Sequence, residues 1–219
     1  MKTAWIFGAT GATGQALVTL IAQQQGFGEV VCINRRPLTE RPAGVTEQIV
    51  GELSPESVSE LAGSPDSVFI CLGTTLAKAG SKAAFKRIDL DLICAVGKWC
   101  SDHQVKQVHL ISAVGANRSA MSFYSRIKGE TEEYFQALEL ATLAIYRPSL
   151  LTQATRSDER FAEKWAARII ALFDWLPLFA GIRRVPVKTL ARAMLSADEK
   201  RLNGTISSAK IQQLGKVSD

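Results

Sequence analysis

The chain begins Met1-Lys-Thr-Ala-Trp-Ile-Phe-Gly-Ala-Thr-Gly-Ala-Thr-Gly14, and this stretch decides the fold. The apolar residues 3–7 predict a strand, three glycines follow at three-residue spacing, and residues 12–25 predict a helix. A strand, a glycine turn and a helix in this order can cradle a pyrophosphate, because backbone without side chains approaches the phosphates and the helix start presents free N–H groups. The alternative, an ordinary glycine-rich turn, is less consistent with the flanking strand and helix. We therefore expect a dinucleotide to lie against Gly8, Thr10, Gly11, Ala12, Thr13 and Gly14.

The composition is that of a globular protein rather than a nucleic-acid-binding or membrane protein. The chain has 219 residues, of which 47% are hydrophobic and 21% are charged, enough for one domain with its own core. Its net charge of +5 comes from scattered basic residues, which argues against a nucleic-acid platform but suits a phosphorylated ligand. No segment resembles a signal peptide or a membrane span, so we expect a cytoplasmic protein without a membrane partner.

The cysteines and histidines do not form a metal-binding pattern. The four cysteines are dispersed without C-x-x-C spacing, and Cys32 and Cys71 lie in apolar runs, where small buried thiols are expected. His109 lies in the apolar run Val-His-Leu-Ile and is better explained as a satisfied sheet residue than as a catalyst. We therefore expect no metal site.

Strand-like and helix-like segments alternate along the chain. Six such alternations with right-handed crossovers predict an α/β protein with a doubly wound parallel sheet, the Rossmann fold. The helix predicted over residues 82–103 carries an apolar stripe that can pack on the sheet or form part of a dimer face. The six predicted strands cover residues 3–7, 29–34, 46–50, 67–72, 107–112 and 142–146.

The segment after the sixth predicted strand differs in composition from the alternating strands and helices before it. We expect a single domain over residues 1–219, in which residues 149–204 form a small substrate cap over the carboxyl edge of the sheet. The chain is expected to return to the sheet near residues 205–207. The aromatic residues of this cap, which can line a pocket or fill a core, include Phe161, Trp165 and Trp175.

The residues twenty positions after the glycines favour NADP(H) over NAD(H). An acidic residue at this place binds the ribose 2′-hydroxyl in NAD-preferring proteins, but this chain has Asn34 followed by Arg35 and Arg36. A guanidinium can hold a 2′-phosphate with two charge-assisted hydrogen bonds. The alternative is that both arginines are simply solvated in a loop.

The candidate catalytic residues are Ser112, Tyr124 and Lys128. Tyr124 and Lys128 are four residues apart at a helix start, so the phenol and the ammonium share one face, and Ser112 lies at the end of a predicted strand. Such a set suits carbonyl reduction: Ser112 would hold the substrate oxygen, Tyr124 would donate a proton, and Lys128 would hold the nicotinamide ribose. A nearby positive charge lowers a tyrosine pKa by about 1–3 units, so we expect Lys128 to lower that of Tyr124.

The glycine turn, Ser112 and the Tyr124–Lys128 pair together resemble the short-chain dehydrogenase/reductase superfamily. The blocks Cys71-Leu-Gly-Thr-Thr75 and Arg147-Pro-Ser-Leu150 are similar to its atypical branch of NAD(P)-binding and sugar-nucleotide-epimerase-like proteins. That branch includes the oxidoreductase-like Tat-interacting protein, which is a regulator that binds NADPH. The resemblance covers most of the chain, and its most discriminating part is the Cys-Leu-Gly-Thr-Thr block.

The resemblance implies further coenzyme contacts. The loop after the fourth strand borders the coenzyme in this superfamily, and the segment after the sixth strand touches its nicotinamide end. Extended members carry an asparagine in the helix after the fourth strand, whereas this chain has Asp89, which departs from the usual proton relay. The added contact residues are Leu72, Gly73, Thr74 and Pro148.

Two functions from different classes follow from these patterns. The first is an NADP(H)-binding oxidoreductase that reduces a small carbonyl compound at the serine, tyrosine and lysine. The second is a regulatory protein that senses NADPH without turnover and contacts a protein partner. A sugar-nucleotide epimerase comes third, because only about 70 residues follow Pro148. The sequence leaves open the substrate and the formation of a homodimer.

Overall fold

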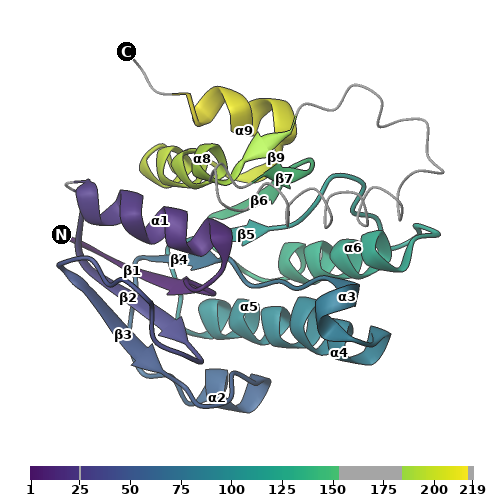
Figure 1. Ribbon diagram of the computed structural model, residues 1–219, viewed down its shortest axis with the longest axis horizontal. Helices are drawn as coiled ribbons and strands as arrows, with labels where there is room; N and C mark the ends of the chain where they lie inside the picture. The colour runs from purple at the N-terminus through teal and green to yellow at the C-terminus, as the bar shows by residue number, and fades with distance from the viewer. Residues whose placement is uncertain (25, 153–183, 217–219) are drawn as a thin grey trace.

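The structure is a computed structural model that describes residues 1–24, 26–152 and 184–216. Its centre is a parallel sheet whose strands lie in the order β3-β2-β1-β4-β5-β6-β9 (Figure 1). The order runs outward from β1 in both directions, which is the doubly wound topology that the sequence predicts. The strands are β1 (Lys2–Phe7), β2 (Phe27–Asn34), β3 (Val45–Ile49), β4 (Ser67–Ile70), β5 (Gln107–Ile111), β6 (Leu143–Arg147) and β9 (Gly204–Ser207).

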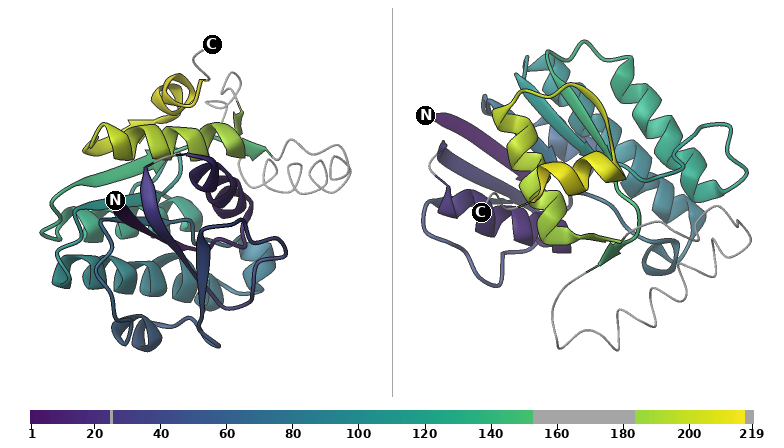
Figure 2. Two further views of the ribbon diagram at one scale, coloured as in Figure 1. Left: turned by 90° about the vertical axis from the view of Figure 1, so that its left-hand side faces the viewer. Right: turned by 90° about the horizontal axis from the view of Figure 1, so that it is seen from above.

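Helices cover both faces of this sheet, as Figures 1 and 2 show. One layer contains α1 (Ala12–Gln23), α8 (Val187–Glu199) and α9 (Ser208–Leu214), which pack on one another. The other contains α2 (Pro55–Ser59), α5 (Ile93–Asp102) and α6 (Phe123–Gln136). Covered on both faces, the central strands can be apolar along their whole length.

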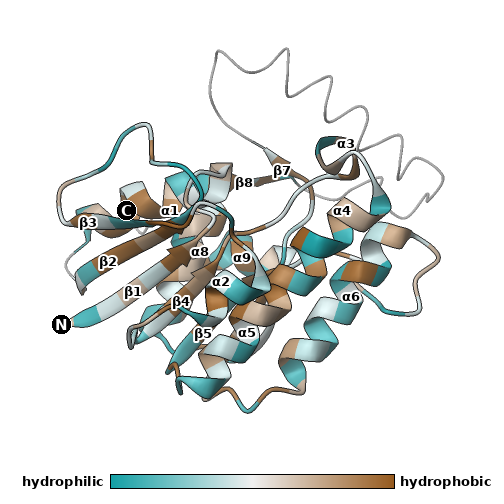
Figure 3. Cartoon of the chain, turned by 90° about the horizontal axis from the view of Figure 1, so that it is seen from below, coloured by the Kyte–Doolittle hydropathy of each residue, from teal (hydrophilic) through white to brown (hydrophobic). Residues whose placement is uncertain are grey.

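Alternate residues of each strand belong to different hydrophobic clusters. In β1, Ala4 and Ile6 pack with α1 and α8, whereas Trp5 and Phe7 pack with α2, α5 and α6. This follows from the period of two in a strand, which sends successive side chains to opposite faces. Figure 3 shows the consequence, because α5 and α6 carry both hydrophobic and hydrophilic residues around strands that are mainly hydrophobic.

The start of α2 is fixed by local interactions of its first residues. The Ser54 hydroxyl accepts a hydrogen bond from the Ser57 N–H, and the Ser57 hydroxyl accepts one from the Ser54 N–H. Pro55 occupies the first helical turn, where its missing N–H is not needed. Serine and proline at these positions therefore fix the place where the chain enters the helix.

The helix predicted over residues 82–103 contains a wider turn that the apolar stripe does not reveal. It begins as α4 (Lys82–Lys86), continues through the π-helical turn η1 (Arg87–Leu92) and ends as α5. Single π turns inside α-helices are found frequently at functional sites. The buried residues of η1 are Asp89 and Leu92, and the backbone carbonyl of Asp89 accepts a hydrogen bond from the Thr131 hydroxyl at 2.8 Å. This external partner compensates for the disturbed helical hydrogen bonding.

The predicted cap falls partly outside the described residues, since Phe161, Trp165 and Trp175 lie in 153–183. On either side of that range, β7 (Leu151–Thr152) pairs in parallel with β8 (Val185–Pro186). Residues 187–199 form α8, which packs against α1, so this part of the expected cap range belongs to a helical layer of the sheet. The return to the sheet near residues 205–207 is confirmed by β9. A search of the described helices finds none with the length and apolar character needed to cross a bilayer.

Candidate coenzyme and active site

The glycine turn after β1 is built so that two of its glycines cannot be replaced without moving backbone. Gly8 has a φ of +82°, and a Cβ there would lie 2.8 Å from the Cys71 carbonyl oxygen. A Cβ at Gly14 would lie 2.3 Å from the Gly8 carbonyl oxygen and 2.7 Å from the Cα of Ala9. The turn is closed by a hydrogen bond from the Gly11 N–H to the Gly8 carbonyl at 3.0 Å. Tight turning and close helix–strand contact are two roles that glycines have in dinucleotide-binding turns.

The start of α1 presents its N–H groups without a side-chain cap. Gly11 is the N-cap residue, makes no side-chain hydrogen bond, and is followed by a first turn without acidic residues. Thr10 and Gly11 are exposed, so the turn is reachable from solvent. An uncapped helix start carries unsatisfied donors and the positive end of the helix dipole, both of which suit a pyrophosphate.

The end of β2 holds the residues expected near the adenosine ribose. Asn34 is buried, its amide nitrogen donates to Glu47 Oε1 at 3.3 Å, and within the described part of the chain its Oδ1 atom has no hydrogen-bond partner. The same Glu47 oxygen accepts from the Leu38 N–H at 2.8 Å. Glu47 thereby closes the turn that carries Arg35 and Arg36, which are exposed. A buried, unpartnered amide oxygen beside two exposed arginines fits a polar, phosphorylated ligand.

The loop after β4 lies between the glycine turn and the candidate catalytic residues. A Cβ on Gly8 would lie 2.9 Å from the Leu72 nitrogen, so this loop touches the turn. At its other side, a Cβ on Gly73 would lie 3.5 Å from Asp89 Oδ1 and 3.9 Å from Lys128 Nζ. The fold therefore brings the glycine turn, the Leu72–Thr74 loop and Lys128 together at the carboxyl end of β4.

Lys128 is held by a buried ion pair. Its Nζ atom lies 2.7 Å from Asp89 Oδ1, and both side chains are buried. The other carboxylate oxygen, Asp89 Oδ2, accepts a hydrogen bond from the Thr74 N–H at 2.8 Å. Asp89 is thus the link between the β4 loop and α6, a role that the sequence pattern does not reveal.

Tyr124 lies one helical turn before Lys128 on α6 and is half-buried against Phe85, with ring centroids 5.8 Å apart. Burial raises the pKa of Tyr124, Lys128 lowers it by less, and Asp89 raises it further, so the pKa lies above its usual value. Lys128 therefore acts in the expected direction, but the net pKa of Tyr124 is raised rather than lowered. The reason is that burial of the phenol outweighs the charge of Lys128, and the carboxylate of Asp89 adds to the effect of burial.

Burial by itself would lower the pKa of Lys128, but the charge of Asp89, the charge of Tyr124, the hydrogen bond to Asp89 and the charge of Glu132 together raise it by more. The pKa therefore lies above its usual value, and Lys128 is a cation at neutral pH.

Ser112 lies directly after β5 and donates a hydrogen bond to a residue that the sequence analysis missed. Its hydroxyl donates to Glu132 Oε1, and both side chains are buried. The Glu132 carboxylate also accepts from Arg147, with Nε at 2.9 Å from Oε1 and 3.1 Å from Oε2. Glu132 follows Lys128 by four residues and so shares its helical face, which is the one signal that could have found it.

Pro148, expected beside the nicotinamide, is buried directly after β6. Its carbonyl accepts a hydrogen bond from the Val114 N–H at 3.0 Å. This bond ties the end of β6 to the loop that follows Ser112. The segment expected to touch the nicotinamide end is therefore joined to the loop that follows Ser112.

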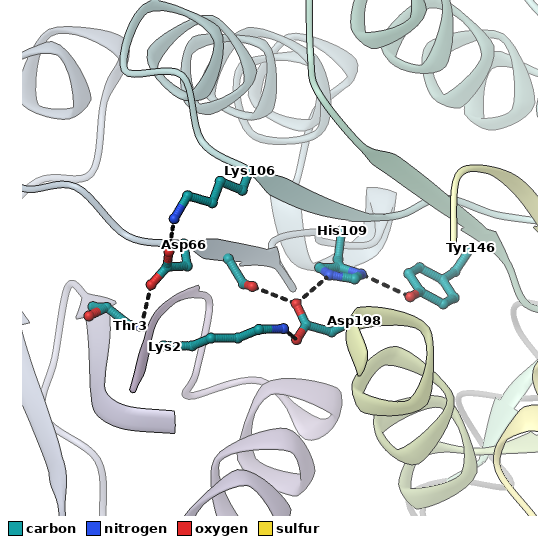
Figure 4. Close-up of polar contacts among 8 residues, drawn as sticks. Lys2, Thr3, Asp66, Lys106, His109, Tyr146 and Asp198 are labelled. Carbon is teal, nitrogen blue, oxygen red and sulfur yellow. Dashed lines mark hydrogen bonds and ion pairs between the residues drawn. The ribbon is translucent and has the colours of Figure 1, made fainter. Parts of the chain in front are cut away.

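His109 belongs to a separate network at the other side of the sheet (Figure 4). Its Nδ1 atom lies 2.9 Å from the Tyr146 hydroxyl, and its Nε2 atom lies 3.2 Å from Asp198 Oδ1. Asp198 also pairs with Lys2 at 3.0 Å and accepts a hydrogen bond from Ser67. The interpretation of His109 as a satisfied sheet residue is therefore confirmed.

The chain is similar to known proteins along its whole length. Residues 8–164 match the protein family described as NAD(P)H-binding. Protein HTATIP2 of Rattus norvegicus is 33% identical over 225 residues, which cover 100% of this chain and 91% of that protein. The mitochondrial protein FMP52 of Eremothecium gossypii is 29% identical over 218 residues, which cover 97% of each chain. These matches confirm the resemblance inferred from the sequence.

Solved structures share the fold at low sequence identity. The Bordetella bronchiseptica enzyme WbmH, solved in complex with NAD+, superimposes with a TM-score of 0.71 at 18% identity, covering 94% of this chain and 75% of that one. UDP-N-acetylglucosamine 4-epimerase from Bacillus cereus gives a TM-score of 0.68 at 14% identity, covering 97% and 83%. At this identity the likeness shows the Rossmann-like fold alone.

Proposed function

This chain belongs to the NAD(P)H-binding family, and from that premise we propose that it is an NADP(H)-dependent oxidoreductase that reduces a small carbonyl compound. The observation that carries the proposal is the position of Lys128, beside the β4 loop that touches the glycine turn. Tyr124 lies on the same helical face one turn earlier. A proton donor next to a coenzyme cradle is the arrangement that carbonyl reduction requires.

The residues of the cradle would hold the coenzyme through main-chain N–H groups at the pyrophosphate and through side chains at the adenosine ribose. The uncapped start of α1 would bind the pyrophosphate, and the Asn34 amide with its unpartnered Oδ1 atom would face the adenosine ribose. Arg35 and Arg36 are exposed beside it and would hold a 2′-phosphate. For this reason we favour NADP(H) over NAD(H).

The chemistry assigned to the protein is proton transfer to the substrate oxygen. Bound NADPH supplies a hydride for the carbonyl carbon. The Tyr124 hydroxyl gives its proton to the carbonyl oxygen, which yields the alcohol, and the tyrosine regains a proton from solvent. Lys128 holds the nicotinamide ribose, and Ser112 turns its hydroxyl from Glu132 to the substrate oxygen.

Replacing the phenol tests this proposal directly. We expect Tyr124→Phe to lower NADPH consumption on a panel of small carbonyl compounds by at least about 100-fold, because general acid catalysis contributes on that scale. NADPH binding, measured by calorimetry, should stay unchanged. Tyr134→Phe is the matched control, since Tyr134 is an exposed residue of the same helix. Turnover retained in Tyr124→Phe would exclude the tyrosine mechanism.

The preference for NADP(H) is tested at Arg35. We expect Arg35→Ala to weaken NADPH binding by about thirtyfold, the equivalent of about 2 kcal/mol for a charge-assisted hydrogen bond, and to leave NADH binding unchanged. Arg41→Ala is the control, because Arg41 is also exposed and lies further along the same connection. Unchanged NADPH affinity in Arg35→Ala would remove this assignment.

A second candidate function is an NADPH-sensing regulatory protein without turnover. The observation that favours it is the Asp89–Lys128 pair, which engages the lysine that would otherwise contact the coenzyme ribose. NADPH binding without turnover on any panel member supports this function, whereas turnover that depends on Tyr124 supports the reductase. In the sensor, the partner would be another protein.

The location and assembly of the protein are also proposals. We propose a cytoplasmic protein that forms a homodimer, although the FMP52 relatives are named as mitochondrial proteins. Cell fractionation and sedimentation of the purified protein test the two proposals separately.

A further inference from the structure

Asp89 stands out because it makes three polar contacts with two other parts of the fold, α6 and the β4 loop. Its carboxylate contacts Lys128 Nζ on α6 at 2.7 Å and the Thr74 N–H in the β4 loop at 2.8 Å. Its backbone carbonyl accepts from the Thr131 hydroxyl, also on α6, at 2.8 Å. The residue lies in the π turn η1, and its side chain is completely buried.

A carboxylate buried in this way needs a strong local partner. Removing a charge from water is unfavourable by several kcal/mol, which only a close and well-oriented ion pair and hydrogen bonds offset. Lys128 and the Thr74 N–H supply these interactions for Asp89. The resulting pair is electrically neutral, so Lys128 does not present a full uncompensated positive charge to its surroundings.

The charged and titratable groups that face this pair can be named for each element around it. From α6 they are Tyr124, one turn before Lys128, and Glu132, one turn after it. Glu132 is itself paired with Arg147 at the end of β6. Asp89 is therefore the carboxylate that balances Lys128, since the nearest other carboxylate is already balanced by an arginine.

On the basis of the proposed function, we propose that Asp89 is a positioning residue that fixes Lys128 against the β4 loop and neutralises it, so that Tyr124 enters the reaction as a proton donor. An asparagine at the same place could hold the Thr74 N–H but could not compensate the ammonium. The raised pKa of Tyr124, caused first by burial and then by Asp89 against the opposing effect of Lys128, agrees with this role. Asp89 thus keeps the phenol in the form that carbonyl reduction consumes.

The experiment is a titration of the Tyr124 phenolate by near-ultraviolet absorbance in the full-length protein without coenzyme. Subtracting the signal of Tyr124→Phe removes the contributions of Tyr134 and Tyr146. We expect Asp89→Asn to form the phenolate at a pH lower than the wild type by at least about 1 unit, because one like charge is removed and one opposite charge is released. The rate of carbonyl reduction by Asp89→Asn should likewise begin to fall at a lower pH than that of the wild type.

Asp91→Asn is the matched control, because Asp91 lies two residues further along the same π turn but is exposed. Its phenolate midpoint should equal that of the wild type. Asp89→Glu, which keeps the charge, should also keep the high midpoint, and it serves as the deciding variant if Asp89→Asn does not fold by circular dichroism. A wild-type midpoint in folded Asp89→Asn, or a lowered midpoint in Asp89→Glu, overturns the proposal.

The titration separates this proposal from the proposed function. It needs neither turnover nor coenzyme, so it reports on Asp89 even in a protein that only binds NADPH. Loss of the proposed function would appear as turnover that is unaffected by Tyr124→Phe, a result on which the phenolate midpoint has no bearing.

Discussion

Two buried polar networks in this protein contain similar residues but lie in different parts of the sheet. The first joins Asp89 to Lys128, with Tyr124 beside them, next to the loop that follows the carboxyl end of β4. The second joins Asp198 to His109, and His109 to Tyr146, while Lys2 and Ser67 bring in the amino ends of β1 and β4 (Figure 4). Each network therefore contains an aspartate, a basic residue and a tyrosine.

The place of a network in the sheet, rather than its residue types, separates a candidate functional site from a structural network. Ligands of doubly wound sheets bind outside the carboxyl ends of the strands, where the first network lies beside the glycine turn. The second network is enclosed between the sheet and α8, and its members hydrogen-bond to one another. We expect changes in the first network to alter turnover and changes in the second to alter folding.

The largest expected effect is on folding, in the second network. Asp198→Asn leaves Lys2 and His109 without their carboxylate, and removal of one partner from a buried pair should lower the free energy of unfolding by about 3 kcal/mol. Urea denaturation measures this loss, and NADPH-dependent turnover below the transition should be unchanged. Asp102→Asn, which removes an exposed pair with Lys98, should have no measurable effect on stability.

This prediction would be contradicted if Asp198→Asn were as stable as the wild type, or if it lowered kcat without lowering stability. Either result would mean that the second network is not a structural element.

A smaller effect is expected from Glu132, which lies at the carboxyl end of the sheet and holds Ser112. Glu132→Gln should reduce kcat by about tenfold, about 1.4 kcal/mol in activation free energy, because the serine loses its charged partner. NADPH affinity should stay unchanged, as measured by calorimetry. Glu133→Gln is the matched control, since Glu133 is the next residue and forms an exposed pair with Arg118. Equal kcat values in the two variants would show that Glu132 does not act through Ser112.

The smallest effect is a pH dependence of stability that belongs to the second network. Burial lowers the pKa of His109 in spite of the opposing effect of Asp198. At a pH between the pKa of the folded state and the unfolded pKa of about 6.5, His109 therefore takes up a proton only in the unfolded chain. Stability should therefore fall as the pH drops below about 6.5, by at most about 1.4 kcal/mol per pH unit.

The pKa of Asp198 is lowered although burial opposes this, because hydrogen bonds from His109, Ser67 and Lys2 favour the carboxylate. Its contribution is present above about pH 4 and is lost at lower pH. Urea denaturation at several pH values checks both windows. His109→Gln should remove the slope just below about pH 6.5. A slope that persists in this variant would belong to other groups.

The parts of the site that were predictable from sequence are those that depend on neighbouring residues in the chain. The glycine turn follows β1 directly, and the requirement for a missing side chain at Gly14 comes from the backbone of Gly8 and Ala9, a few residues earlier. The Ser54–Pro55 helix start and the apolar strands are local in the same sense. The structure of these elements is determined by residues that are close together in the chain.

The parts that were not predictable depend on contacts between distant segments. Glu47 lies 13 residues from Asn34, and Glu132 lies 20 residues from Ser112, and each pair meets only after the sheet and its helices have packed. The π turn at Asp89 is hidden for a similar reason, because the apolar stripe of the helix continues through it while its hydrogen bonds reach Thr131. The burial that raises the pKa of Tyr124 against the effect of Lys128 also arises only when these segments pack.

The central claim is that the glycine turn at the start of the chain binds the pyrophosphate of a nicotinamide dinucleotide. Calorimetric titration of the purified protein with NADPH tests it most directly. We predict saturable binding of one NADPH per chain, which Gly14→Ala should abolish because the new methyl group meets the Gly8 carbonyl and the Ala9 backbone. No heat from either NADPH or NADH, or equal binding by a folded Gly14→Ala variant, would contradict the account.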